Sequence, residues 1–354
     1  MQYAFPGNLI LEVGYLGNRG IYLINGDPGK PYDQLPTSNL SQGAALQNTQ
    51  VANPFYGVIT TPGSDLAQPM IQASKLLRKW PQYDGVMSFR KPGASSTFNA
   101  FTIRANKQLS NGLAFTLAFT DGREYDNSAA AVTYLGPVSS TYADQYNPKG
   151  EWAIGAQNVN YQIVSSVIYE LPFGHGKAFL NSAGKGANLL VNGWQLAGIE
   201  NWSTGNPVVL NTFDNGTTAE TIFTLGQRPA WNGKSSSKGT GPYTKFNWQD
   251  FAKPAPYTIG NAPRALGWVH NPDSQNFDFS LTKNTRFGDR YNVQIRMEMF
   301  NAFNHPNLGS VDSNFGDQSF DSNGNRTGGN FGKVPTGSFS NSSRQIQLAA
   351  KFYY

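Results

Sequence analysis

The chain has 354 residues and a formal net charge of +5, and only 14% of its residues are charged, against about 25% in a typical soluble domain. With 13% aromatic residues, 38 glycines and 21 prolines, it is too aromatic for a disordered chain and too poor in charge for an ordinary cytosolic surface. The absence of cysteine excludes a disulfide framework and a thiolate site. No run approaches the roughly 18 apolar residues of a transmembrane helix. The mild, dispersed positive charge argues against nucleic acid as a partner.

Alternation of apolar and polar residues predicts eight strands. Successive side chains of a strand point to opposite sides, so each of these segments has one apolar and one polar face. Each is close to the 9–11 residues that a tilted strand needs to cross a bilayer. Met1–Phe5 is predicted to be a stub of a further strand. In chain order the predicted strands are 8–16, 98–109, 112–122, 159–171, 192–203, 275–286, 290–303 and 343–354.

The last strand is the most informative one. It places five apolar or small residues on one side and ends on an aromatic without a polar tail: Ile346, Leu348, Ala350, Phe352 and Tyr354. An outer-membrane β-barrel needs such a strand, with its apolar side in lipid and an aromatic at the interface. The same pattern resembles the C-terminal signal that the barrel-assembly machinery recognises. The predicted fold class is therefore all-β, a transmembrane antiparallel β-barrel segment of about eight strands plus a stub.

The polar faces of the strands are predicted to line a lumen. The side chains assigned to this face are Asn292, Gln294, Arg296, Glu298, Asp278, Ser280 and Thr282. A small closed barrel fills its interior with packed side chains, whereas a wide one can leave it polar and wet. This polar set favours a wide lumen. Arg296 and Glu298, two apart on one strand face, have the spacing of an ion pair.

The connections predict the topology. Pro6-Gly7-Asn8, Ser110-Asn111-Gly112 and Phe287-Gly288-Asp289 have the residues of tight hairpin turns. Long stretches at about 17–97, 123–158, 204–274 and 304–342 are far longer than ordinary loops. With the C-terminus at the periplasmic rim, all four long stretches fall on the outer side. The tight turns and a medium connection at 172–191 fall on the inner side, which is the asymmetry of outer-membrane barrels.

The start of the chain carries no basic region, apolar segment and cleavage site of a signal peptide. A barrel protein needs one to reach the outer membrane. We therefore expect the chain to be the C-terminal portion of a longer protein.

Several motifs carry a family resemblance. They are Gly7–Gly20 (GNLILEVGYLGNRG), Asp33–Pro36 (DQLP), Asn53–Gly57 (NPFYG), Leu76–Arg78 with Tyr83, Tyr169–Gly174 (YELPFG), Gly193–Gly198 (GWQLAG), Phe300–Asn307 (FNAFNHPN) and Asn330–Lys333 (NFGK), followed by Arg344–Gln347. In this order and combination the chain resembles the Oar-like TonB-dependent outer-membrane receptors common in acidobacteria. The resemblance covers essentially the whole chain.

The resemblance implies a receptor that moves a ligand across the outer membrane with energy from the TonB complex. The signal peptide, carboxypeptidase-regulatory-like module, TonB box, plug domain and early barrel strands of that family have no counterpart in residues 1–354. Such transporters close about 22 strands around a plugged lumen. The implied partners are membrane lipid, the barrel-assembly machinery, the TonB complex and an unidentified ligand.

Enzyme and metal signals are weak, and we expect neither an enzyme nor a cofactor. The Gly-Lys motifs at 174–177 and 328–333 lack the upstream Gly and downstream Ser or Thr of a phosphate-binding loop. The histidines are His175, His270 and His305, none at a metal-ligand spacing. His270 with Asp273 is the best accidental metal pair.

Aromatic residues gather in the 204–274 stretch, and Trp231, Trp248 and Trp268 are candidates for contact with a ligand. The simpler interpretation is that they pack the long loop onto itself and onto the barrel rim. Two other functions stay open: a free-standing eight-stranded barrel that acts as an anchor or adhesin, and a secreted β-sandwich that binds carbohydrate.

Overall fold

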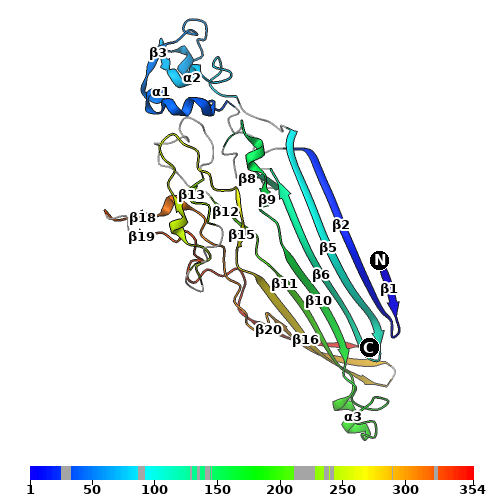
Figure 1. The fold of residues 1–354 in the computed structure, drawn as a ribbon. Coiled ribbons are helices and arrows are strands. Elements are labelled where there is room, and N and C mark those ends of the chain that lie inside the picture. Colours follow the sequence, from blue (N-terminus) through cyan, green and yellow to red (C-terminus); the bar gives the residue numbers. More distant parts are fainter. Residues whose placement is uncertain are drawn as a thin grey trace.

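The structure, a computed structural model, describes residues 1–24, 33–86, 92–127, 130–133, 136–139, 144, 146–210, 228–234, 239, 243–288, 290–322 and 326–354. In this part of the chain, nine strands follow one another across a single antiparallel sheet, each paired with its neighbour in sequence order (Figure 1). They are β1 (Gln2–Phe5), β2 (Leu9–Ile24), β5 (Pro92–Ser110), β6 (Leu113–Asp126), β10 (Tyr161–Glu170), β11 (Trp194–Ser203), β16 (Ser274–Phe287), β17 (Tyr291–Phe300) and β20 (Gln345–Tyr353).

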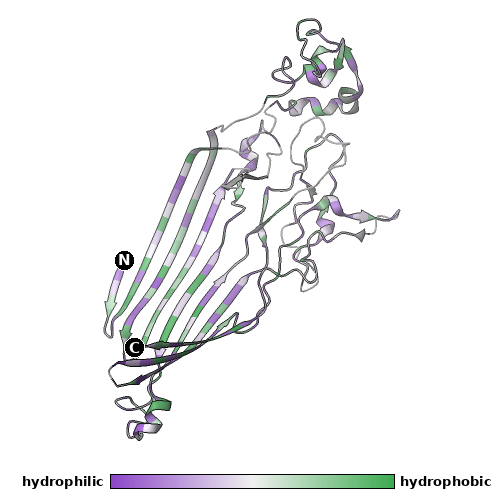
Figure 2. Cartoon of the chain, turned by 180° about the vertical axis from the view of Figure 1, so that it is seen from behind, coloured by the Kyte–Doolittle hydropathy of each residue, from purple (hydrophilic) through white to green (hydrophobic). Residues whose placement is uncertain are grey.

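This sheet confirms the predicted eight strands and the stub. Sheet neighbours are also sequence neighbours, so the sheet is an up-and-down meander rather than the two stacked sheets of a sandwich. Its two edges are β1 and β20, which do not pair with each other among the described residues. Figure 2 shows hydrophobic and hydrophilic residues alternating along the strands.

Three strands are longer than their apolar patterns predicted. β2 continues to Ile24 and β5 begins at Pro92, so the first long loop is shorter than the predicted 17–97. β6 continues to Asp126, where the second loop was predicted to start at 123. The extra residues stay in register, with Ser96 opposite both Gly20 and Asp126. Ladder hydrogen bonds come from the backbone, so pairing continues after the apolar alternation has ended.

The hairpin turns lie where the sequence placed them. Asn111 and Gly112 both have positive φ, 52° and 79°, as a two-residue type I′ turn requires. Gly7 and Asn8 have φ of 79° and 61° at the first turn. In the third turn Gly288 has a φ of 62°, and Asp289 lies outside the described residues. These turns and the connection 172–191, which contains α3 (Lys185–Val191), lie at one end of the sheet (Figure 1). We call it the inner end.

The long loops lie at the opposite, outer end and contain short elements of their own (Figure 1). The first holds η1 (Thr37–Gln42), α1 (Ala44–Asn48), β3 (Gln50–Ala52), η2 (Asp65–Ala67), β4 (Met70–Gln72) and α2 (Ala73–Leu76). The second holds β7 (Ala130–Thr133), β8 (Gly136–Ser139), η3 (Pro148–Glu151) and β9 (Ala153–Ile154), which pairs with β6. The third and fourth hold β12 (Pro207–Val209), β13 (Ala230–Trp231), η4 (Trp248–Asp250), β14 (Phe251–Ala252), β15 (Ala265–His270), η5 (Phe315–Asp317), β18 (Ser319–Phe320) and β19 (Arg326–Gly328).

The main buried core belongs to these loops and not to the sheet. Its buried residues come from the third and fourth loops: Val208, Leu210, Phe246, Phe251, Ala262, Leu266, Val269, Val311, Phe315, Phe331 and Val334. Among the described helices, none has the length and hydrophobicity needed to span a bilayer.

Candidate functional site

The strand register joins the apolar faces into one surface. Residues directly opposite each other in an antiparallel pair lie on the same face. One such row crosses six strands through Leu348, Met297, Leu281, Leu196, Tyr169 and Leu113. In this row Leu348 is 75% exposed and the other five side chains are partly exposed, and Ile295 on the same face is 56% exposed, although all are apolar or aromatic. We call this surface the apolar face. Its exposure is what a lipid-facing barrel wall requires.

Polar residues mark the upper and lower limits of the apolar face. Toward the outer end these are Asp121, Glu200 and Gln275, and toward the inner end they are Lys107 and Lys283. On β16, Gln275 and Lys283 enclose Phe277, Phe279 and Leu281 on the same face. This interval of eight residues spans roughly 27 Å along the strand. Tilted by about 40°, it covers roughly 21 Å along the membrane normal, most of the apolar band of about 25 Å around an outer-membrane barrel.

The opposite face carries the residues predicted to line a lumen. Ser280 lies opposite Glu298, and Thr282 lies opposite Arg296, so the polar sets of β16 and β17 form one patch. Arg296 donates to Glu298 Oε1 at 3.3 Å and to Gln294 Oε1 at 3.3 Å. Asn276 donates to Asp278 Oδ1 at 2.9 Å, and Asn292 lies beside Arg286 in the register. Most of these side chains are half-buried, Thr282 is buried, and Asn292 Oδ1 has no hydrogen-bond partner among the described residues. A polar patch of this kind can stay wet.

The three candidate tryptophans lie at the edge of the loop core. Trp231 and Trp268 stack at a centroid distance of 4.9 Å. Trp248 contacts the ring of Phe320 at 5.6 Å, and the guanidinium of Arg326 lies 5.7 Å from its ring centroid. All three pack against the buried cluster. In this structure their rings serve loop packing, as the simpler sequence interpretation held.

Two buried arginines join the second and third loops. Arg228 forms an ion pair with Glu151, and both side chains are at least nine-tenths buried. Arg264 pairs with the Asp126 carboxylate at the end of β6, and its Nε donates to the Glu151 carbonyl at 3.2 Å. Buried charges are tolerated only when paired and hydrogen-bonded, so these contacts fix one loop on the other.

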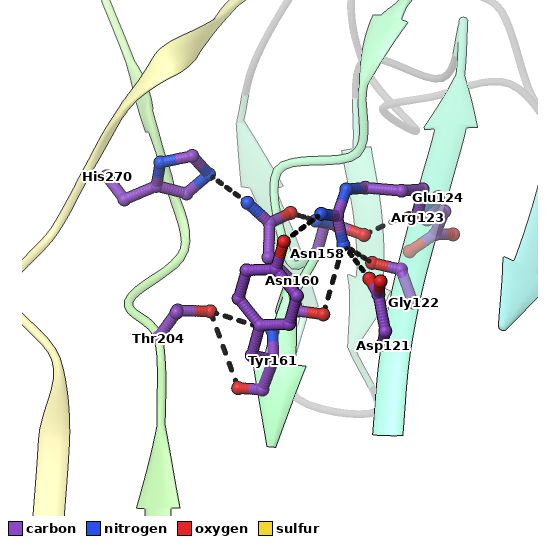
Figure 3. A network of polar contacts seen from close by, with 9 residues as sticks. All are labelled: Asp121, Gly122, Arg123, Glu124, Asn158, Asn160, Tyr161, Thr204 and His270. Atoms are coloured by element: carbon purple, nitrogen blue, oxygen red, sulfur yellow. Dashed lines mark hydrogen bonds and ion pairs between the residues drawn. The ribbon is translucent and has the colours of Figure 1, made fainter. Parts of the chain in front are cut away.

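A second polar network joins the outer ends of β6 and β10 to β15 (Figure 3). Arg123 contacts the Asp121 carboxylate, donates to the Asn160 carbonyl at 3.0 Å and lies over the Tyr161 ring at 4.9 Å. The Asn160 amide donates to His270 Nε2 at 3.0 Å. Burial lowers the pKa of His270, and the positive charges of Arg123 and Lys245 lower it further, against a smaller opposing effect of Asp273. These effects disfavour the protonated form of His270.

Asparagines fix the outer ends of β16, β17 and β20. Asn301, at a φ of 49°, donates to the carbonyls of His305 and Ser342, both at 3.1 Å. Asn307 forms two hydrogen bonds with the backbone of Gln275, each at 2.9 Å. Its side chain is only 4% exposed, so these bonds have little competition from water. The fourth loop is thus anchored to the wall at the start of β16.

A cavity of about 580 Å³ lies at the inner end of the wall. Its charged lining residues include Glu170, Lys177, Lys283 and Arg286, and Lys177 pairs with Glu170 at 3.2 Å. The Gly-Lys motif at 174–177 belongs to this region. Its backbone N–H groups at His175 and Gly176 donate to Asn188 and Asn181 side chains. These donors are already engaged within the connection.

No group of three or more metal-ligating side chains occurs in the described part of the chain. His270 Nε2 contacts Asn160, and His305 Nδ1 contacts the Asn307 amide oxygen at 3.2 Å. Both rings therefore act as members of hydrogen-bond networks.

The chain thus has an antiparallel sheet with a continuous apolar face, an opposite face with a polar patch on β16 and β17, and long loops at one end. These features define the wall of a membrane β-barrel. Residues 1–347 match the family model described as outer membrane beta barrel domain, and the chain belongs to that family. Its localisation is the outer membrane, and the secreted β-sandwich is excluded. Comparison with curated proteins and with solved structures gave no match.

Sequence reasoning did not find the residues that hold the loops together. Asn301 and Asn307 lie in the FNAFNHPN motif, which pointed to a family but not to a structural role. Arg228 and Arg264 lie far from Glu151 and Asp126 in the chain, and no spacing rule connects them. The signal in the sequence that could have indicated these loop contacts was the presence of polar residues flanked by glycine and proline in a long loop.

Proposed function

We propose that the chain forms barrel wall and outer loops of a TonB-dependent outer-membrane receptor of the Oar-like kind, which moves a ligand across the outer membrane. The function is passage of a ligand, without covalent catalysis by this chain. Its partners are membrane lipid, the barrel-assembly machinery, the TonB complex and a ligand.

One observation carries the proposal: the polar patch on β16 and β17, where Arg296 pairs with Glu298, lies on the face opposite the lipid-facing one. The Arg296 and Glu298 side chains keep 35% and 27% of their surface exposed. In a small closed barrel, this face would have to be filled by packed side chains. An accessible polar face suits a wide, wet lumen through which a ligand passes.

The loop core supports the same function. The third and fourth loops pack around Phe246, Phe251, Phe315 and Phe331, whose rings meet edge to face at 5.0–5.4 Å. Because ordering a loop during binding costs conformational entropy, loops ordered in advance favour capture of a ligand at the outer mouth.

The test is uptake by Gram-negative cells that carry the intact gene, a gene disruption, or a deletion of the TonB complex. We expect a set of medium compounds whose uptake falls equally in the disruption and in the TonB deletion. Identical uptake in all three strains would reject transport. A heat-resistant, monodisperse monomer of the 354-residue chain would instead favour the free-standing barrel acting as an anchor or adhesin.

A further inference from the structure

The inner connection 172–191 exposes an unusual amount of apolar surface. Phe179, Leu180, Leu189 and Leu190 are 59%, 56%, 41% and 73% exposed. A loop that faced only water would gain nothing from exposing four such side chains, and exposed apolar surface indicates a contact with protein or membrane.

The connection is tied to the apolar face of the wall. The indole Nε1 of Trp194 donates to the Leu190 carbonyl at 2.8 Å. Lys283 Nζ donates to the Asn192 carbonyl and lies 5.8 Å from the centroid of the Trp194 ring. Trp194 and Lys283 are opposite each other in the register, one row below Leu196 and Leu281. The end of α3 is therefore held beside the lower limit of the apolar face.

Lys283 and Trp194 have the chemistry of a membrane interface. Tryptophan and lysine gather where the hydrocarbon meets the headgroups, because each combines an apolar body with a polar end. Lys283 is 6% exposed, and its acceptors are the neutral oxygens of Asn192, Asn284 and Thr285. Its positive charge is not compensated by a carboxylate of the described residues within ion-pair distance. The exposed Lys185 adds a second cation at the start of α3.

We propose that the connection 172–191 is an interfacial anchor that lies in the phospholipid leaflet at the inner end of the wall. Leu189 and Leu190 insert among the acyl chains, next to the lipid-facing row of Leu281 and Leu196. The exposed Lys185 lies at the level of the phosphate groups, whose negative charge it complements, and the buried Lys283 adds positive charge at the same level without contacting them. The lipid contact is continuous with the apolar face of the barrel wall. This anchor does not depend on TonB or on ligand transport.

The experiment uses the absence of cysteine from these 354 residues. Single-cysteine variants Leu190→Cys and, independently, Leu189→Cys are assembled in the outer membrane, purified and labelled with an environment-sensitive fluorophore. They are reconstituted in vesicles of phosphatidylethanolamine and phosphatidylglycerol with or without brominated acyl chains. Leu348→Cys is the matched control on the lipid-facing strand surface, and Thr116→Cys is the control on the polar face.

We expect bromolipid to quench the labels at Leu189 and Leu190 as strongly as the label at Leu348, with little quenching at Thr116. Quenching at Leu348 without quenching at either leucine of α3 overturns the proposal. In that case, accessibility to iodide in water would mean that the connection is solvated. Protection from both quenchers would mean that protein covers it.

Discussion

Asn307 and Gln275 form a side chain–backbone pair that imitates a β-ladder. The Gln275 N–H donates to Asn307 Oδ1, and Asn307 Nδ2 donates to the Gln275 carbonyl, both at 2.9 Å. The backbone N–H and carbonyl of Gln275 are thereby both hydrogen-bonded at the point where the strand ladder meets the fourth loop. One buried amide replaces the residue pair that a further strand would supply.

Asn307→Ala should therefore destabilise the outer end of the wall. The change leaves the part-buried N–H and carbonyl of Gln275 without their side-chain partner. A fully buried unsatisfied group costs about 1–3 kcal/mol, which is an upper limit for each of these two. The measurement is the rate of protease cleavage of the outer loops on intact cells, which should rise. Asn330→Ala, at an exposed asparagine of the same loop, is the control and should leave that rate unchanged. Equal rates in both variants would contradict the role of the pair.

Arg228→Met should release the third loop from the second. It removes the Arg228 guanidinium from the buried Glu151 carboxylate, and breaking a buried ion pair in this way costs about 3–5 kcal/mol. The double variant Arg228→Met/Glu151→Leu should be less damaging than the single one, because no buried charge is left unpaired. Thermal unfolding of the purified protein, followed by tryptophan fluorescence, measures both. A double variant worse than the single one would count against the pair.

His270 should make the loop network sensitive to acid. The pKa of His270 in the folded protein lies below its ordinary value of about 6.5, so below that pH the unfolded state binds more protons than the folded state. Stability contributed by neutral His270 is complete above about pH 6.5 and is lost as the pH falls through and below that value. Protease cleavage of the loops should accelerate from about pH 7.5 to pH 5.

His270→Gln removes the titrating group and should flatten this pH dependence. His175→Gln, at an exposed histidine of the inner connection, should keep it. An unchanged pH profile in His270→Gln would show that another group is responsible.

The apolar face should tolerate charge poorly. Leu117→Arg places a cation in lipid near the middle of the band, at a cost of about 2–4 kcal/mol. Ile295→Arg, opposite Lys283 at the lower limit of the apolar face, should hinder assembly less. Thr116→Arg, one residue from Leu117 and on the opposite face, should assemble far better. The amount of heat-modifiable protein in outer membranes measures assembly. Comparable yields of Leu117→Arg and Thr116→Arg would refute the assignment of the two faces.

Tyr354 should matter for assembly and not for the ligand. It stacks on Phe352 at 6.3 Å at the inner end of β20, far from the outer loops. Tyr354→Asp should lower the amount of protein in the outer membrane, because it removes an interfacial aromatic from the predicted barrel-assembly signal. Tyr354→Phe, which keeps an aromatic ring, should leave the amount of protein in the outer membrane at its normal level. Surface labelling of cells gives the amount, and normal abundance of Tyr354→Asp would mean that this residue is an ordinary strand-end aromatic.

The sequence by itself determined the wall. Strand side chains alternate with a period of two, so the faces of residues such as Ile295 and Arg296 can be assigned from the sequence of that one strand. The tight turns could be predicted as well, since a two-residue hairpin turn requires positive φ and Asn111-Gly112 are residues that adopt it readily. The strand ends could not be predicted as well, because the backbone pairing of Gly20 with Ser96 needs no apolar side chain.

Only the tertiary structure decided what holds the outer end together and what the inner connection contacts. Arg228 meets Glu151, and Asn307 meets Gln275, across long stretches of chain. Such pairs follow from how the loops fold over one another, and no periodic pattern in the sequence predicts them. Likewise Lys283 became informative only when the register placed it beside Trp194 at the edge of the apolar face. Local patterns specify local geometry, whereas buried polar partners are chosen by the packing of distant segments.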